Sequence, residues 1–198
     1  PARLAGCLRG DHRLIEANEG PASADLARRW LAAQPRAAYH VRASSGTAAF
    51  SVHVYLPEPD DLMTDDPVAA AVWALGEQHG ALRPGERFNV ARFSGASSRY
   101  QGDPLQLLVS GTACVLEWVT VPAAWTFMTP RTDHFATYFE YLGMTRMHDL
   151  TIDEGPPIVM HGWNRQRLTL PDFFEMMAIR ALTGRSVHLR PSCCAPPR

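Results

Sequence analysis

The sequence of 198 residues contains no lysine, so all 19 of its basic residues are arginines. Without a lysine amine, the chain cannot form a lysine Schiff base. It also cannot build the phosphate loop of P-loop enzymes, which needs a lysine. GC-rich codons favour arginine, alanine, proline and glycine, and this coding bias is a sufficient explanation of the composition. The absence excludes classes of enzyme but does not point to one.

Cysteine is scarce as well, with four copies that form no recognisable motif. Three of them lie near the two ends of the sequence, and none belongs to a C-x-x-C pair. We therefore predict no metal site and no disulfide framework. Cys114 falls inside a predicted helix, where we expect a small buried hydrophobic residue.

The chain also lacks an excess of charge of either sign and lacks long hydrophobic runs. Its net charge is −1, so we expect neither nucleic acid nor a membrane surface as a partner. No apolar run reaches the length of a membrane span and no secretory signal is visible, which predicts a cytoplasmic protein. The 46% of apolar residues can bury a sizeable core, and the length predicts one domain.

A β-hairpin is the clearest local signal that is present. Residues 38–43 and 47–56 alternate between apolar and polar positions, and Ser44-Ser45-Gly46 separates them. Successive residues of a strand point to opposite faces of the sheet. The second strand is therefore predicted to place Ala48, Phe50, Val52, Val54 and Leu56 on one face and Ala49, Ser51, His53 and Tyr55 on the other.

The other elements follow from hydrophobic period, caps and breakers. Further strands are predicted at 13–17, 87–93, 125–128, 145–152 and 158–163. Helices are predicted at 23–33, 67–78, 103–121, 133–142 and 169–183. The third of these helices is expected to point Leu105, Leu108, Thr112, Val115, Leu116 and Val119 inward. Hairpins and helical crossovers mix in one sheet, so the predicted class is α+β, or mixed α/β. Residues 1–12 are expected to be a lead-in, 13–184 a single domain and 185–198 a flexible tail.

The stretch from Trp125 to Trp163 carries the strongest fold signal. A strand is followed by an amphipathic helix, Gly143 ends that helix in a left-handed conformation, and a hairpin closes the stretch. Together with the preceding elements, this order resembles the GNAT acetyltransferase superfamily, and within it GNAT-like proteins of GC-rich bacteria. The resemblance covers residues 13–183. It implies a central mixed, mostly antiparallel sheet flanked by helices, with a cleft where the fourth and fifth strands splay apart.

The resemblance also implies a site for acetyl-CoA or another acyl-CoA. Family members bind the pyrophosphate at a Q/R-x-x-G-x-G/A loop after the fourth strand, where backbone N–H groups at a helix N-terminus hold the anion. Residues 92–97 match this pattern except at the last position, which predicts Arg92, Gly95, Ala96 and Ser97 as cofactor-binding residues. An ordinary Ser/Gly surface loop is the alternative. The next helix begins late, and Asp103 would place a carboxylate where the phosphate should bind.

The family's general acid is a tyrosine in the helix before the last hairpin, within the pattern F-Y-E-K-L-G-F. Aligned on Leu142-Gly143, this chain has Phe139 at that position. Tyr138, one residue earlier, is the predicted catalytic acid, and a core aromatic residue is the alternative reading. Glu86, just before the fourth strand, is the predicted base.

Other polar residues near these positions are interpreted as surface or structural residues. Asn89 lies on the fourth strand and Glu117 on the following helix, and each is more often a solvated surface group. His40 and His53 are symmetric about the first hairpin turn, as His148 and His161 are about the second. Such pairs bind metal or sense pH, but two ligands do not make a site, so structural histidines are favoured.

Two functions from different classes remain open. The first is an acyl-CoA-dependent N-acyltransferase, in which a small-molecule amine attacks the thioester directly. The second is a GNAT-like fold with a degenerate acetyl-transfer site, used for ligand binding, regulation or other biosynthetic chemistry. A homodimer is conceivable through Trp118, Trp125 and Trp163, unless these residues belong to the core.

Overall fold

The computed structural model describes residues 2–44, 46–152 and 156–184, which form one mixed sheet with helices around it. The strands are β1 (Ala38–Ala43), β2 (Gly46–Leu56), β3 (Arg87–Ala96), β4 (Ala123–Met128), β5 (Thr145–Leu150) and β6 (Ile158–Asn164). The helices are α1 (Ala2–Ala33), α2 (Asp61–Asp65), α3 (Pro67–His79), α4 (Pro104–Thr120), α5 (Ala136–Tyr141) and α6 (Leu170–Thr183), and the 3-10 turn η1 (Asp133–Phe135) precedes α5.

The six strands lie in the order β1-β2-β3-β4-β6-β5. β3 and β4 run parallel and are joined through α4, whereas the other neighbouring strands are antiparallel. A two-residue loop is enough for an antiparallel hairpin, but a parallel pair needs a longer crossover, here a helix. The predicted α+β class with a mostly antiparallel sheet flanked by helices is therefore confirmed.

β3 and β4 pair over only part of their length. Their register runs from Arg87 opposite Ala123 to Ala91 opposite Met128, where β4 ends. β3 continues to Ala96 without β4 beside it. The pairing of the predicted fourth and fifth strands thus stops halfway, at the place where the family resemblance implies a cleft.

A β-bulge lies at the same point of β3. Ala91 is paired with His53, but Phe93, rather than Arg92, is paired with Val52. Arg92 is therefore the extra residue, and such an insertion bends the strand that contains it. The bend in β3 begins where its pairing with β4 ends.

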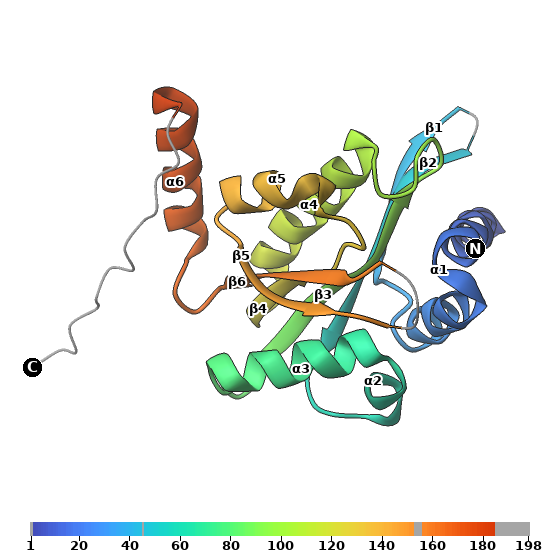
Figure 1. The fold of residues 1–198 in the computed structure, drawn as a ribbon, viewed down its shortest axis with the longest axis horizontal. Helices are drawn as coiled ribbons and strands as arrows, with labels where there is room; N and C mark the ends of the chain where they lie inside the picture. Colours follow the sequence, from blue (N-terminus) through green and yellow to red (C-terminus); the bar gives the residue numbers. More distant parts are fainter. Residues whose placement is uncertain (1, 45, 153–155, 185–198) are drawn as a thin grey trace, which may run out of the picture.

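Helices cover both faces of the sheet, as Figure 1 shows, with α2 and α3 on one side and α4 and α5 on the other. The first hydrophobic core lies between the sheet and α1 and α3, and it contains Trp30, Val72, Phe88 and Phe127. The second lies between the sheet and α4, α5 and α6, and it contains Cys114, Phe139, Trp163 and Phe173. The strands β3, β4 and β6 therefore contribute residues to both cores.

The N-terminal part of the chain differs from the prediction. The structure has helix over 2–33, so the strand expected at 13–17 is wrong, and residues 2–12 of the expected lead-in are helical. Gly20, at φ 87°, and the following Pro21 break this helix into two segments, because proline removes a helical hydrogen bond. Ile15 is buried against the first core, so its short apolar run belongs to a helix face.

The orientation of α4 is also opposite to the prediction. Its buried residues are Gln106, Val109, Ser110, Ala113, Cys114 and Glu117. The residues expected to point inward include Leu108, Leu116 and Val119, which are 56%, 51% and 68% exposed. Burying polar side chains costs free energy unless they are hydrogen-bonded. The polar face of α4 can be buried because side chains of the sheet bind it, as described below.

The remaining expectations concern the hydrophobic residues and the end of the chain. No helix within the described residues has the length and apolar character needed to cross a membrane. Trp125 and Trp163 are buried in the two cores, so they do not form a surface for a dimer. The predicted tail at 185–198 lies outside the described residues.

Candidate functional site

A small apolar pocket lies between α4 and α5, next to the last residue of β4. Side chains fill most of it, and its free volume is about 10 Å³, room for about one water molecule. Its walls are formed by Leu107, Ser110, Gly111 and Cys114 of α4, by Met128 of β4, by Tyr138 and Phe139 of α5, and by Leu142, Met144 and Trp163. Since β3 and β4 stop pairing at Met128, the pocket adjoins the end of the paired region. We call it the acyl pocket below, for the group that it would hold.

Tyr138, the predicted acid, lines this pocket. Its hydroxyl lies against Gly111 of α4, since a β-carbon built on that glycine would be 3.6 Å from it. Burial raises the pKa of Tyr138, and the nearby Cys114 raises it further, so the phenol is protonated at neutral pH. A protonated phenol at the pocket wall can donate a proton to a leaving group, but the catalytic role itself stays a prediction.

Phe139 is almost fully buried and packs against the imidazole of His161, with 4.9 Å between the ring centroids. Residues 138 and 139 thus both line the pocket, although only Tyr138 brings a polar group to it. Although Tyr138 comes one residue earlier than the tyrosine of the family pattern, it still lines the pocket.

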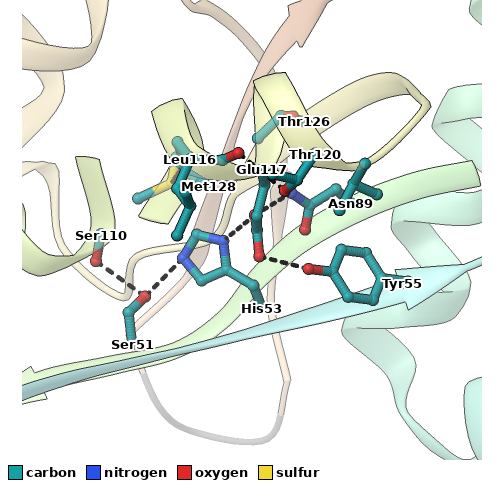
Figure 2. Close-up of polar contacts among 12 residues, drawn as sticks. Ser51, His53, Tyr55, Asn89, Ser110, Leu116, Glu117, Thr120, Thr126 and Met128 are labelled. Atoms are coloured by element: carbon teal, nitrogen blue, oxygen red, sulfur yellow. Dashed lines mark hydrogen bonds and ion pairs between the residues drawn. The ribbon is translucent and has the colours of Figure 1, made fainter. Parts of the chain in front are cut away.

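A buried polar network joins β2 to α4 beside the acyl pocket. Alternation along β2 places Ser51, His53 and Tyr55 on the face that α4 covers. Ser110 and Glu117 are seven residues apart, about two helical turns, so both lie on the face of α4 that is opposite these strand residues. Figure 2 shows these side chains pointing toward one another across the space between strand and helix.

His53 is at the centre of the network. Its Nδ1 lies 2.7 Å from a carboxylate oxygen of Glu117, and its Nε2 lies 2.9 Å from the hydroxyl of Ser51. The hydroxyl of Ser110 donates to Ser51 at 3.0 Å. All four residues are fully buried. Because Ser110 also lines the acyl pocket, a continuous chain of hydrogen bonds leads from the pocket wall to Glu117.

Glu117 accepts further hydrogen bonds from the Tyr55 hydroxyl at 2.7 Å and from the Asn89 amide. Burial alone would raise the pKa of Glu117, but the nearby His53 and the hydrogen bonds from His53, Tyr55 and Asn89 hold it below its usual value. The ionised carboxylate fixes the tautomer of His53 with the proton on Nδ1. Nε2 is then an acceptor, which receives the Ser51 hydroxyl.

The sequence predicts the strand half of this network but not the helix half. It predicted Ser51, His53 and Tyr55 on one face of the strand, and the structure confirms this face. It predicted Glu117 to be a solvated surface group, which is wrong, because the residue is fully buried. The available signal was the stripe of Gln106, Ser110 and Glu117 at helical spacing.

A second, polar pocket opens at the carboxyl ends of β3 and β4. It is open to solvent and has a free volume of about 360 Å³. Its walls come from Asn18 of α1, from Arg99, Tyr100, Gln101 and Gly102 after β3, from Arg131, Thr132 and His134 after β4, and from Pro156. Arg131 is paired with Glu19 at 3.3 Å, whereas Arg99 is exposed. With arginines and no carboxylate in its walls, this pocket favours an anionic group.

The predicted cofactor-binding residues lie in or beside β3, because that strand runs to Ala96 instead of ending at Phe93. Arg92 is buried on the α3 face, where its Nε donates to Asp66 at 2.8 Å. Gly95 and Ala96 are buried strand residues, and Ser97 donates its backbone N–H to Ala48 at 2.9 Å. Cofactor binding at these four residues stays a prediction, and the Arg92 guanidinium is already engaged.

The N-terminus of α4 holds a carboxylate. Asp103 is the N-cap and accepts from the backbone N–H of Leu105 at 2.8 Å and from the hydroxyl of Ser98. These hydrogen bonds keep the pKa of Asp103 below its usual value. A phosphate at this helix end would meet a negative charge, so the polar pocket beside it is the better position for one.

Glu86, the predicted base, lies just before β3 and lines neither pocket. Its carboxylate accepts from Gln166 at 2.7 Å and from the backbone N–H of Arg83 at 2.9 Å. The structure therefore does not bring Glu86 and Tyr138 together in one pocket. The role of Glu86 as a base stays a prediction.

The two expected histidine pairs are not cross-strand pairs. His40 is opposite Phe50 and contacts Asp11 of α1, whereas His53 faces α4. His148 is opposite Met160, and the partner of His161 is Arg146. His148 and His161 are out of register by one residue, at a β-bulge, whereas His40 and His53 are out of register by three. Among the described residues, no group of three or more potential ligands could hold a metal ion.

No protein-family model matches the sequence, and no curated protein is similar to it. Among solved structures, the chain is similar to FeeM, an N-acyl amino acid synthase from uncultured soil microbes, with a TM-score of 0.54. The two are 11% identical, over 92% of this chain and 90% of FeeM. At this identity the likeness shows the fold alone, and that fold is the mixed, mostly antiparallel sheet flanked by helices that the sequence predicts.

Proposed function

We propose that the chain is an N-acyltransferase that moves an acyl group from an acyl thioester, such as acyl-CoA, to a small-molecule amine. The observation that carries the proposal is the acyl pocket, where an apolar space and the protonated Tyr138 hydroxyl meet at the end of the β3–β4 pairing. The fold it shares with an N-acyl amino acid synthase supports the same reaction class.

The reaction needs one bond to form and one to break. The amine nitrogen attacks the thioester carbonyl carbon, a C–N bond forms, and the C–S bond breaks. The amine must lose a proton, and the leaving thiolate gains one, for which Tyr138 is the donor. The result is an amide and a free thiol.

The two pockets divide the substrates by polarity. The acyl pocket is apolar, so its lining favours an acyl chain over water. Because its free volume is only about 10 Å³, the chain enters as the side chains that line the pocket move apart. The polar pocket offers Arg99 and Arg131 to an anionic group. That group is either a phosphate of the donor or a carboxylate of an amino acid acceptor, the acceptor class that the name of FeeM states for that protein.

The test is a matrix of donors and acceptors. Purified protein is incubated with acyl-CoA thioesters from acetyl to palmitoyl, and with amino acids and their decarboxylated counterparts. Amide formation is followed by mass spectrometry and thiol release by absorbance. We expect at least one pair to give amide and thiol in equal amounts. Absence of amide with every pair would overturn the proposal.

Tyr138→Phe tests the acid in the same assay. We expect kcat to fall roughly 100-fold, at the lower end of the usual contribution of general acid catalysis. Tyr141→Phe is the matched control on α5, because its ring lies under the Arg180 guanidinium, with 5.5 Å between the ring centre and that group. Equal activity of the two variants would remove Tyr138 from the reaction.

Arg99→Ala distinguishes the two sources of the anion. If the polar pocket holds a donor phosphate, the KM for acyl-CoA rises while the KM for a phosphate-free pantetheine thioester does not. If it holds the acceptor carboxylate, the KM for the amino acid rises and that for the decarboxylated amine does not. An unchanged KM for all substrates would show that the arginine binds neither.

A further inference from the structure

We infer that Ser110, Ser51 and His53 form a proton relay that acts as the general base toward the acceptor amine, with Glu117 stabilising the protonated imidazole. The inference rests on the proposed function, because it assigns the base of that reaction. It replaces the sequence-based candidate Glu86, which lines neither pocket.

The geometry connects the pocket wall to the buried histidine without a gap. Ser110 lines the acyl pocket, and its hydroxyl lies 3.0 Å from that of Ser51. The Ser51 hydroxyl lies 2.9 Å from Nε2 of His53. Figure 2 shows Ser110, Ser51 and His53 in sequence along the dashed lines. Both separations suit proton transfer between hydrogen-bonded groups.

The direction of the hydrogen bonds allows the proton to move away from the pocket. With the imidazole proton on Nδ1 facing Glu117, Nε2 has a free lone pair. As the amine attacks, its proton passes to the Ser110 oxygen, the proton of Ser110 passes to Ser51, and the proton of Ser51 passes to Nε2. After the C–S bond breaks, the imidazolium and the Tyr138 phenolate return to their starting states by proton exchange with solvent.

The carboxylate of Glu117 faces the imidazole at the end of the relay. It lies 2.7 Å from Nδ1 of His53, whose ring packs against that of Tyr39. The other titratable and charged groups around the pair of His53 and Glu117 are Tyr39 of β1, Tyr55 of β2, Cys114 of α4 and Arg165 after β6. Burial raises the pKa values of Tyr39, Tyr55 and Cys114, so these three remain neutral and Glu117 is the nearby anion.

A structural role accounts for Ser51, which satisfies the buried Nε2 of His53, but it does not account for Ser110. Glu117 is already bound by His53, Tyr55 and Asn89, and these contacts hold α4 to the sheet. Alanine at 110 would leave the hydrogen bond from Ser51 to His53 in place. The Ser110 hydroxyl is the group that links this pair to the acyl pocket.

The test compares Ser110→Ala and Ser51→Ala with the wild type at the donor and amine pair found above. We expect kcat to fall roughly 100-fold or more in each variant, the usual range for loss of a general base, with the KM for the donor unchanged. The pH profile of kcat/KM should lose the ionisation that belongs to the relay. The slowing of the reaction in heavy water should also diminish.

Ser94→Ala is the matched control. Ser94 is a buried serine that also faces α4, where it accepts from Gln106 at 2.8 Å, and it lies outside the relay. This variant should keep the wild-type pH profile. Each substitution removes one hydroxyl, so unfolding curves can confirm that all three variants are folded at the assay temperature.

Three results would overturn the relay. The first is wild-type kcat and pH profile in Ser110→Ala. The second is an acyl ester on Ser110 when protein and donor are mixed without amine, since Ser110 would then be a nucleophile. The third is a wild type that transfers no acyl group at all, which overturns the proposed function together with the relay, whereas the first two leave the proposed function standing.

Discussion

Two buried histidines show how much a residue's neighbours determine its chemistry. His53 binds Glu117 and Ser51, so both of its ring nitrogens are satisfied. His161 is equally buried, but neither of its ring nitrogens has a hydrogen-bond partner. Burial, followed by the nearby Arg146, lowers the pKa of His161. The first histidine is hydrogen-bonded on both sides, and the second is held neutral by burial.

Replacement of His161 by leucine should stabilise the protein. A buried polar group without a partner costs about 1–3 kcal/mol, and leucine removes that cost. The folded-state pKa of His161 is below its unfolded value, so the wild-type protein loses stability as the pH falls below the unfolded pKa. Above that pH, the contribution of His161 to the free energy of unfolding does not change with pH. The gain in unfolding free energy should therefore be larger at pH 5.5 than at pH 7.5.

Urea unfolding at both pH values measures this effect. His148→Leu is the control, because His148 is exposed on the neighbouring strand β5. A destabilised His161→Leu variant, or a gain that does not depend on pH, would show that the imidazole has a partner such as ordered water.

At the scale of the element, α4 reverses the usual arrangement of an amphipathic helix. It buries Gln106, Ser110 and Glu117 and exposes an apolar stripe that includes Leu108 and Leu116. Helix periodicity identifies the two faces, but it does not identify which one meets the sheet. The polar residues that β2 and β3 present to α4 make the polar face the better partner.

Two glutamate substitutions should destabilise the protein to very different extents if the polar face of α4 is buried. Leu116→Glu places a charge in water, so the free energy of unfolding should change by less than about 0.5 kcal/mol. Val109→Glu places one at a buried position near Ala49 and Ala96 and should cost several kcal/mol, on the order of 4 or more. Denaturant unfolding of both variants measures the difference. A reversed order would mean that the leucine face is buried.

Gly111 tests the contact between α4 and α5. Alanine in a helix interior is more stable than glycine by about 1 kcal/mol, and its methyl group would lie 3.6 Å from the Tyr138 hydroxyl without a clash. Gly111→Ala should therefore raise the melting temperature while narrowing the acyl pocket. If the pocket binds the acyl chain, kcat/KM should fall more for long-chain than for short-chain donors. A uniform change for all donors would place the acyl chain elsewhere.

At the scale of the whole molecule, a second buried network fixes the opposite face of the sheet. Asp66 is the N-cap of α3, accepts from the indole N–H of Trp30 in α1, and pairs with Arg92 of β3. Burial alone would lower the pKa of Arg92, but the carboxylates of Asp66 and Glu19 raise it above its usual value. One carboxylate thus ties two helices to the bulge of β3.

Asp66→Asn should be strongly destabilising. It keeps the side-chain shape but removes the charge that balances the buried Arg92, and loss of one partner of a buried ion pair costs about 3–5 kcal/mol. Asp65→Asn is the neighbouring control, because Asp65 pairs with Arg29 at the surface, where ion pairs contribute about 1 kcal/mol or less. Urea unfolding compares them. Equal losses would mean that Arg92 is balanced without Asp66.

Most of the elements could be predicted because their signals are local. The first hairpin, the helix at 169–183 and the left-handed residue Gly143 all lie where the sequence predicts them. Each depends on residues within a few positions of one another. The sequence predicts α1 only from residue 23, because the apolar run around Ile15 is too short to distinguish a strand from a helix.

The candidate site was predicted only in part, because it joins residues far apart in the sequence. Tyr138 could be proposed from its place beside a family pattern, and it does line the acyl pocket. Arg92 could be found by pattern, but only the fold shows that Asp66 binds it. His53 and Glu117 are 64 positions apart, and no local pattern relates them.

The sequence alone determined most of the strands and helices after residue 23, and their order, because caps, breakers and periodicity act over a few residues. Only the tertiary structure decided which face of α4 is buried and which polar side chains meet there. Those outcomes depend on burial, and burial depends on the packing of distant segments, which no local pattern contains.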